Sequence, residues 1–134
     1  MNIEEVRLCA LALPRVTEDM PFGDNVVTFR IEGKIFLCLW LDGESPRFAL
    51  KLRPERNEEL RVQYGSITPA WHWNKKHWSD VHCSMLDNSL VENLIHESYH
   101  LVLSLLPRRI REGYTQTIEE QNMGDTSPIK PKTC

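Results

Sequence analysis

The densest group of chemically versatile side chains lies between residues 71 and 78. It combines three of the chain's four tryptophans with two histidines, two lysines and one asparagine, and it reads Trp71, His72, Trp73, Asn74, Lys75, Lys76, His77 and Trp78. Lysines contact phosphates, asparagine can form a paired hydrogen bond to adenine, and aromatic rings stack on unpaired bases. The segment therefore carries the side chains that nucleic-acid binding needs.

The same side chains suit a second function, the binding of a small ligand or of another protein. Ligand pockets are mostly apolar with a few convergent polar groups, and Trp71, Asn74, Lys75 and His77 would supply this mixture for an anionic or planar molecule. Tryptophans also bury large areas in ordinary cores, so Trp71 and Trp78 equally suit a structural role. A convex basic ridge would favour DNA, whereas a concave site beside Trp78 would favour a ligand.

The distribution of charge decides whether DNA is a reasonable partner. The net charge is −3, but residues 47 to 78 hold seven basic and three acidic residues, and the rest hold nine and sixteen. A local charge of +4 against −7 elsewhere can create a face that attracts anions. We therefore predict a site for double-stranded DNA, or alternatively for an anionic small molecule or a protein. Its residues are Lys51, Arg53, His72, Asn74, Lys75, Lys76, His77 and Trp78.

A zinc-hydrolase pattern, H-E-x-x-H, occurs at residues 96 to 100. On a helix, His96 and His100 point away from the apolar stripe, so we expect both to face water without a third ligand or a walled cleft. The match is interpreted as accidental, and no metal or cofactor is predicted. No nucleophile accompanies His72 and His77, so we expect no enzymatic activity, and Asp80 is interpreted as a turn residue or as a solvated partner of the lysines.

Composition indicates one folded domain. The 134 residues are 41% hydrophobic and 26% charged, which is typical of globular proteins. The longest apolar stretch, Ile35 to Leu41, is far too short for a membrane-spanning helix, and the acidic N-terminus does not resemble a signal peptide. We expect a cytoplasmic protein. None of the four cysteines forms a C-x-x-C pair, so neither a zinc ribbon nor a thioredoxin-like motif is indicated.

Helical and strand patterns then predict the elements that hold the segment. A helix over residues 3–13, with Asn2 as N-cap, precedes strands over 26–31 and 34–41 that meet at a two-residue turn, Glu32-Gly33. The second strand is apolar on both faces and should be central, and residues 46–52 complete an antiparallel meander.

The second half of the chain is predicted to hold two helices, with an irregular and then extended stretch over residues 67–81 between them. Pro54 begins a surface helix that ends near Tyr64, and a short strand covers 81–85. A capping box at residues 89–92 begins the last helix, which runs to Pro107. Residues 1–112 form the domain, and the polar residues 113–134 are expected to form a flexible tail.

Several short motifs resemble the MmcQ/YjbR family. They are Pro21-Phe22-Gly23, Gly33-Lys34-Ile35-Phe36, Leu50-Lys51, Pro54-Glu55, Leu60-Arg61, Pro69, His72 to Trp78, Ser98-Tyr99 and Leu106-Pro107-Arg108-Arg109. They cover most of residues 1–112, and the segment from His72 to Trp78 is the most specific of them. His96 and His100 are not part of the family pattern.

The resemblance implies an α+β fold in which an antiparallel sheet packs with an N-terminal helix, a C-terminal helix and a short middle helix. This arrangement is similar to the frataxin-like fold and is described as a double-wing, DNA-binding arrangement, in which hairpins act as wings against the duplex. The DNA-binding role rests on fold-level comparison, and no cofactor or reaction comes with it. The chain departs from the family pattern in having Trp73 beside His72 and in its C-terminal tail.

Overall fold

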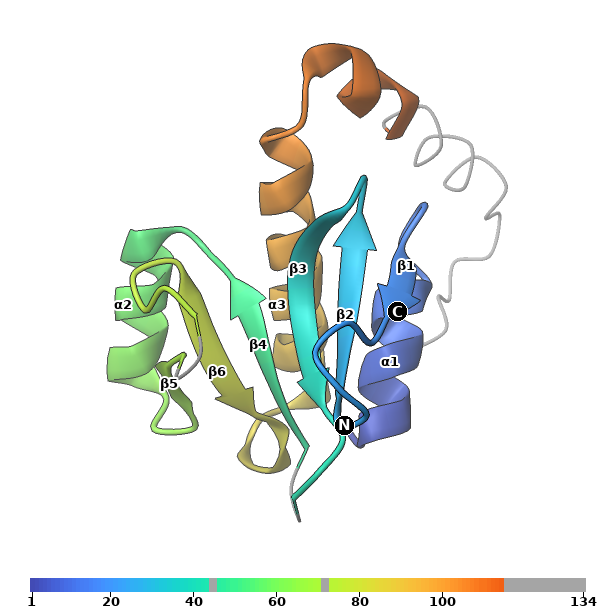
Figure 1. Cartoon of the computed structure of the whole chain (residues 1–134). Coiled ribbons are helices and arrows are strands. Elements are labelled where there is room, and N and C mark those ends of the chain that lie inside the picture. The colour runs from blue at the N-terminus through green and yellow to red at the C-terminus, as the bar shows by residue number, and fades with distance from the viewer. Residues whose placement is uncertain (44–45, 71–72, 115–134) are drawn as a thin grey trace, which may run out of the picture.

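The computed structural model describes residues 1–43, 46–70 and 73–114 of the chain. Helices and strands follow one another along these residues as α1 (Ile3–Leu11), β1 (Thr17–Asp19), β2 (Val26–Ile31), β3 (Lys34–Trp40), β4 (Arg47–Lys51), α2 (Pro54–Gln63), β5 (Ile67–Pro69), β6 (Trp78–His82) and α3 (Asn88–Ser104). The strands form one antiparallel sheet in the order β1-β2-β3-β4-β6-β5. The predicted α+β fold class and the antiparallel meander are confirmed (Figure 1).

Local sequence explains the first elements. Asn2 caps α1 through a reciprocal capping box with Glu5, as a polar residue before an apolar helix should. The turn between β2 and β3 uses Glu32 and Gly33 at φ values of 49° and 77°, the left-handed region that a two-residue hairpin requires. Strand β3 lies between β2 and β4 with its middle residues buried, so its predicted central position is confirmed.

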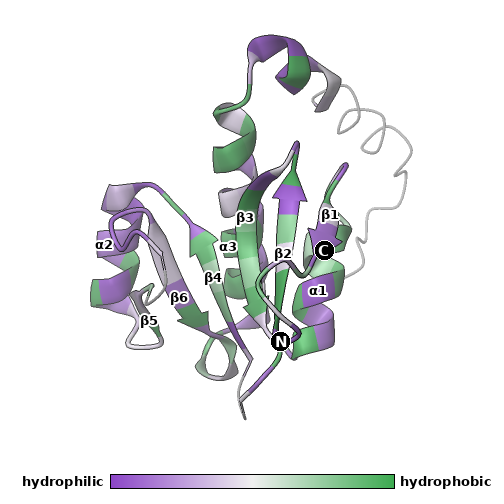
Figure 2. Ribbon diagram, in the orientation of Figure 1, coloured by the Kyte–Doolittle hydropathy of each residue, from purple (hydrophilic) through white to green (hydrophobic). Residues whose placement is uncertain are grey.

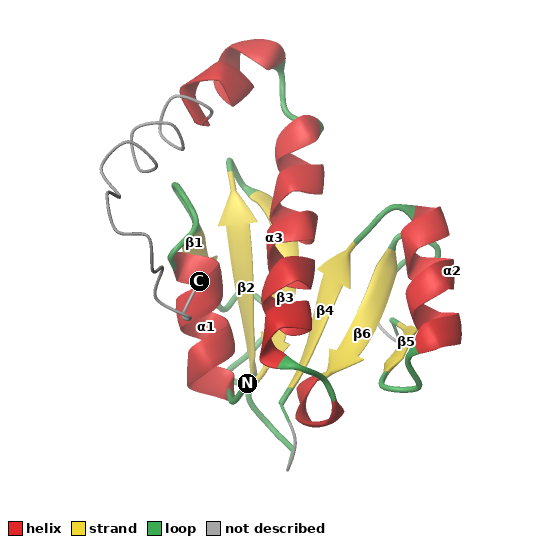
Figure 3. Ribbon diagram, turned by 180° about the vertical axis from the view of Figure 1, so that it is seen from behind, coloured by secondary structure: helices red, strands yellow, loops and turns green. Residues whose placement is uncertain are grey.

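The helices α1, α2 and α3 lie on the same face of the sheet (Figures 1 and 3). Strands β2 and β3 are coloured mostly as hydrophobic in Figure 2. Strand residues alternate between the two faces, and those facing the helices are apolar. They form the main core with the buried sides of the helices; its strand members include Val27, Phe29, Ile31, Leu37, Leu39, Phe48, Leu50 and Val81. The opposite face carries a smaller cluster built from Val26, Cys38, Ala49, Ala70 and Trp78.

Strands β3 and β4 part where Ser98 of α3 inserts its hydroxyl between them. Their pairing runs from Trp40 opposite Arg47 to Leu37 opposite Leu50, and the next pair in register would be Phe36 and Lys51. The Ser98 hydroxyl replaces the backbone partner of each residue. Its Oγ donates to the Phe36 carbonyl at 2.7 Å and accepts from the Lys51 amide at 3.1 Å. In Figure 1, β4 leans away from β3 beyond this point.

Tyr99, the next residue, ties the same helix to the start of the chain. Its hydroxyl donates to the Pro14 carbonyl at 2.8 Å, and its ring meets Phe36 edge to face at 5.6 Å. The Ser98-Tyr99 motif therefore has a structural role in closing the core.

Two predicted boundaries are wrong. Helix α3 begins at Asn88 with Asp87 as its N-cap and no side-chain capping bond, so the residues at 89–92 lie inside the helix and form no capping box. The strand predicted over 81–85 begins instead at Trp78, because residues 78–82 pair with β4 and residues 79–81 also pair with β5. Cys83–Met85 forms a 3₁₀ turn. The strand predicted over 26–31 matches β2 at both ends, and the ends of the other predicted elements differ by at most two residues.

Packed structure continues through Tyr114. Residues 108–114 are helical, the Tyr114 ring is buried, and its hydroxyl donates to the Glu32 carboxylate at 2.9 Å. The described fold thus extends two residues past the predicted boundary at 112, and residues 115–134 of the predicted tail lie outside the described residues. Across the described ranges, no helix has the length and apolarity needed to cross a membrane.

Candidate functional site

The segment singled out in the sequence folds as a turn around Asn74. The Asn74 carbonyl accepts hydrogen bonds from the amides of His77 at 3.2 Å and Trp78 at 2.9 Å. Its side-chain oxygen accepts from the Lys76 amide at 2.9 Å. Such local bonding from an asparagine side chain is typical of turns. The oxygen predicted to contact a base is therefore used within the turn itself.

Two side chains of helix α2 form hydrogen bonds with the backbone of this turn. Asn57, which is fully buried, donates to the carbonyls of Leu52 at 3.2 Å and Lys76 at 3.0 Å. Arg61 donates to the carbonyls of Lys75 at 2.5 Å and Trp78 at 2.8 Å. Burial lowers the pKa of the Arg61 guanidinium from its usual value. The helix that reads as a polar surface element thus fixes the backbone of the candidate site.

The turn presents its side chains unevenly. Asn74, Lys75 and Lys76 are exposed, His77 is half-buried, and only 9% of Trp78 is exposed because it belongs to the smaller core cluster. His72, which was predicted to contact a base or phosphate, lies outside the described residues. The structural role considered for Trp78 is confirmed, and Asn74 and the two lysines form the exposed part of the turn.

The basic residues of the 47–78 stretch do not gather on one face. Arg47 stacks its guanidinium on the Trp40 ring at 4.8 Å, and Arg56 forms an ion pair with Glu97 of α3 at 3.1 Å. Lys51 is opposite Trp78 in the β4–β6 pairing, so its side chain lies on the sheet face that carries the smaller cluster. The charge excess seen in the sequence is therefore divided between the two faces of the sheet.

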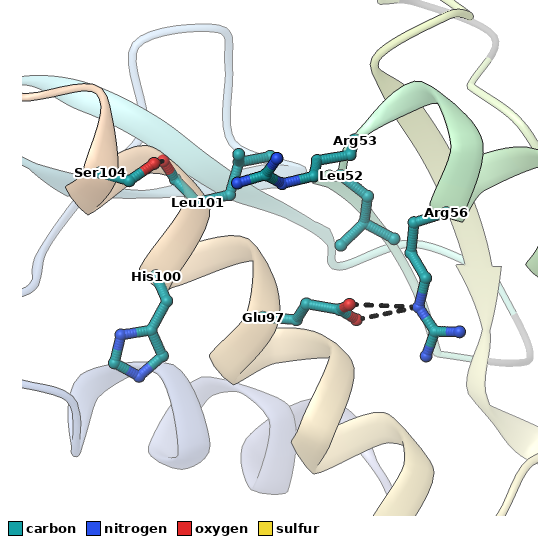
Figure 4. Close-up of a pocket in the computed structure, with 7 residues that line it drawn as sticks. All are labelled: Leu52, Arg53, Arg56, Glu97, His100, Leu101 and Ser104. Atoms are coloured by element: carbon teal, nitrogen blue, oxygen red, sulfur yellow. Dashed lines mark hydrogen bonds and ion pairs between the residues drawn. The ribbon is translucent and has the colours of Figure 1, made fainter.

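Arg53 is separated from the other predicted site residues. It precedes α2 and lines a hollow with side chains of α3, on the face that carries the helices (Figure 4). Of the predicted residues, the structure brings together Asn74, Lys75, Lys76, His77 and Trp78 in one turn, with Lys51 beside Trp78.

A concave site lies beside the turn on the open face of the sheet. Trp73 stacks on Trp78 with ring centroids 4.9 Å apart and 25° between the planes, and Phe22 meets Trp73 edge on at 6.0 Å. Phe22, Trp73, Val26 and Trp40 enclose a space of about 310 Å³, which we call the aromatic hollow. The indole N–H of Trp73 is buried and has no hydrogen-bond partner.

Four parts of the chain position the walls of the aromatic hollow, one for each of its lining residues. Val26 and Trp40 are partners in the β2–β3 pairing and share one sheet face, whereas Phe22 comes from the loop before β2. Gly23 has φ +127°, a conformation that side chains other than glycine rarely adopt, and it lets the chain turn directly after Phe22. Sequence reasoning missed Phe22, Val26 and Trp40 as site residues. The alternation of side chains between the two faces of β3 could have indicated that Trp40 lies on the same sheet face as Cys38.

Asp80 differs from its sequence interpretation. It lies within β6, opposite Ala49, and only 7% of it is exposed. It is therefore a strand residue and not a turn residue, and its side chain is buried and not solvated. Its position on the sheet face beside Ala49 follows from the alternation that places Trp78 there.

The residues of the H-E-x-x-H pattern are used in packing. Glu97 is bound to Arg56, and His100 is exposed with its ring against Tyr99 at 5.2 Å. His96 is half-buried with Nε2 shielded from solvent, so the expectation that both histidines face water is wrong for His96, because the helix packs more of its circumference than the apolar stripe indicates. Partial burial of the two imidazole rings lowers the pKa of His96 and of His100. The described residues contain no cluster of three or more His, Cys, Asp or Glu side chains that could hold a metal.

Comparison with known proteins gives related sequences and structures. A family model described as YjbR matches residues 11–101. "Uncharacterized protein YbdF" of Escherichia coli O157:H7 is 36% identical over 107 residues, which cover 79% of this chain and 88% of that protein. The crystal structure of Deinococcus radiodurans protein DR2400, with a DUF419 domain, has a TM-score of 0.79 at 29% identity and covers 85% of this chain and 88% of its own. A Pseudomonas syringae protein has a TM-score of 0.56 at 27% identity, covering 64% of this chain and 86% of its own.

Proposed function

This chain belongs to the YjbR family, and from that premise we propose that it is a binding protein whose ligand is a planar, anionic small molecule seated in the aromatic hollow. The observation that carries the proposal is the concave shape beside Trp78, with rings of Phe22, Trp40 and Trp73 as its walls. A volume of about 310 Å³ lies within the size range of small-molecule sites.

The chemistry around the hollow supports a ligand with both a flat body and a negative charge. Aromatic walls favour a planar ring through stacked and edge-on contacts. The Arg47 guanidinium lies on the Trp40 ring and supplies a positive charge at that wall, which it shares with the Asp42 carboxylate at 3.9 Å. The buried N–H of Trp73 adds an unsatisfied donor, which an acceptor on the ligand would complete.

The test is a thermal-shift and tryptophan-fluorescence screen against nucleotides and aromatic carboxylates, using the whole chain and a Phe22→Ala variant. Phe22 is 59% exposed, so its removal should leave the fold intact while weakening binding at least fivefold. Leu105→Ala is the matched control, because Leu105 is 63% exposed and does not line the hollow. Stabilisation by no compound, or equal binding by the Phe22→Ala variant, would show that the proposal is wrong.

A second candidate function, binding of double-stranded DNA, is favoured by the turn itself. Lys75 and Lys76 are exposed on a backbone that Asn57 and Arg61 hold in place, so two cations are presented outward from a fixed support. Cations held in this way suit contacts with phosphates, which position a protein on a duplex without reading its sequence.

The measurement for this candidate is duplex-DNA affinity at several salt concentrations. Replacing both lysines, Lys75→Ala/Lys76→Ala, should weaken binding uniformly and lower the slope of log affinity against log salt by about 2, because about one counterion is released per phosphate contact. A double variant that binds DNA as the parent does would exclude this role for the turn.

The proposal includes no catalytic step. Support comes from Glu97, which would be the base of a zinc hydrolase but is bound to Arg56, and from His77, which has no nucleophile at motif-like spacing. Incubation with candidate ligands followed by mass analysis of the recovered compounds checks this point, and any turnover would contradict it.

A further inference from the structure

A second concave site lies between α2 and α3, on the other face of the sheet from the aromatic hollow. We call it the α2–α3 hollow. Its volume is about 380 Å³, and it is lined by Leu52, Arg53, Arg56, Glu97, His100, Leu101 and Ser104 (Figure 4). The hollow lies next to the point where Ser98 parts β3 from β4, since Leu52 and Glu97 of its lining directly adjoin Lys51 and Ser98 in the chain.

The hollow combines an apolar surface with a cationic wall. Leu52 is buried and Leu101 is half-buried, and together they supply aliphatic surface. In Figure 4 the Arg53 side chain reaches across the hollow toward Leu101 and Ser104. The Ser104 hydroxyl donates to the Leu101 carbonyl at 2.6 Å, so its oxygen remains an acceptor.

The two arginines of the wall differ in how their charge is used. The Arg56 Nε donates to both oxygens of Glu97, at 3.1 and 3.3 Å, so this pair neutralises itself. No hydrogen bond or ion pair is found for the Arg53 guanidinium in the described part of the chain. Arg53 therefore leaves one positive charge uncompensated beside apolar surface.

An adjoining hollow extends this surface toward the end of the described fold. It has a volume of about 290 Å³, shares His100 and Ser104 with the first, and adds Arg111 and the ion pair of Arg108 with Glu112 at 3.2 Å. The two hollows together are lined by four arginines and two glutamates. A concave surface with this excess of positive charge raises the local concentration of anions.

We propose that the α2–α3 hollow binds a small organic anion, with its carboxylate or phosphate on Arg53 and its apolar body against Leu52 and Leu101. Guanidinium groups bind both kinds of oxyanion with two parallel hydrogen bonds, and such charge-assisted bonds are stronger than neutral ones. The site is independent of the proposed ligand of the aromatic hollow, since the two share no residue.

The test uses benzoate and phenyl phosphate as probes, in an NMR titration of the isotopically labelled whole chain at low salt. Shifts at Leu101 and at the Arg53 side chain are expected with at least one probe, and the tighter probe identifies whether the site selects a carboxylate or a phosphate. Shifts confined to the aromatic hollow, or none with either probe, would overturn the proposal.

Matched variants separate a site from a general effect of charge. Arg53→Gln should weaken binding of the tighter probe at least tenfold, whereas Arg109→Gln, on an exposed side chain outside both hollows, should leave it within twofold. Glu97→Gln removes the carboxylate that competes for Arg56 and should tighten binding more than Glu58→Gln, which makes the same charge change on an exposed residue. Equal losses in the two arginine variants would show only nonspecific attraction and would overturn the proposal.

Discussion

The hydroxyl of Ser79 donates a 2.7 Å hydrogen bond to the side-chain oxygen of Asn57, and both residues are fully buried. This bond joins the β6 strand to α2. The Asn57 side-chain nitrogen donates to the carbonyls of Leu52 and Lys76, so both polar atoms of the side chain are hydrogen-bonded within the protein. The order of the candidate site therefore depends on a residue that touches neither hollow.

Replacement of Asn57 by alanine should destabilise the protein by about 2–4 kcal/mol, because the Leu52 and Lys76 carbonyls lose their donor and the Ser79 hydroxyl loses its acceptor, keeping only the hydrogen bond from Arg61 at 3.2 Å. Urea denaturation measures the loss. Asn93→Ala is the control, since Asn93 is exposed on α3, and it should change the free energy of unfolding by no more than about 0.5 kcal/mol. Equal effects of the two substitutions would contradict the role given to Asn57.

Replacement of Ser98 by alanine should cost about 1–3 kcal/mol, since the Phe36 carbonyl and the Lys51 amide both lose their partner. Hydrogen exchange gives a local reading, because the Lys51 amide should exchange faster in the variant. Ser104→Ala, at an exposed position of the same helix, should leave that amide unchanged. If the Lys51 amide exchanges at the same rate in the Ser98 variant, the Ser98 hydroxyl does not take the place of a backbone hydrogen-bond partner.

Stability should fall as the solution is acidified from pH 7.5 to 5.5. Burial lowers the pKa of His96 and His100 below the ordinary value of 6.5, so the unfolded chain binds more protons than the folded one in this range. The stabilising effect of the neutral rings is complete above pH 6.5 and is lost as the pH falls through their folded pKa values. Denaturation midpoints at three pH values measure it, and a His96→Gln/His100→Gln variant should show a flatter profile.

The thiols of Cys38 and Cys83 should resist alkylation in the folded protein. Both are buried, and burial raises their pKa values to about 12 and about 11, so almost no reactive thiolate forms at pH 8. Iodoacetamide labelling followed by peptide mass analysis should find both residues unmodified in native protein and modified in urea. Rapid labelling of either residue without denaturant would contradict the described packing.

Much of the fold could be predicted because several of its elements depend on residues that are neighbours in the sequence. The Asn2 cap, the Glu32-Gly33 turn and the doubly apolar strand that contains Phe36 depend on neighbouring residues, and each is confirmed. The predicted capping box at Ser89 is wrong, because it too was inferred from neighbouring residues alone. A capping pattern is local, whereas the start of α3 depends on where the chain leaves the sheet.

The candidate site was harder to predict, because tertiary contacts decide how its residues are used. Arg56 and Arg61 look like surface cations, yet one pairs with Glu97 and the other holds the carbonyl groups of the turn. Phe22 is about fifty residues from Trp73 in the sequence, and no periodic pattern links them. A pattern of residue types identifies the segment, but only the fold shows which of its charges remain available.

The hydrogen bonds from α3 to earlier parts of the chain determine how late in synthesis the fold can be completed. Ser98 reaches back 62 residues to Phe36, and Tyr99 reaches back 85 residues to Pro14. While the ribosome has not yet released residues 88–104, the apolar side of β2, β3 and β4 has no covering helix from this part of the chain. A nascent chain paused before residue 88 should therefore be a substrate for chaperones, and the protein should acquire its protease resistance only as its last long helix emerges.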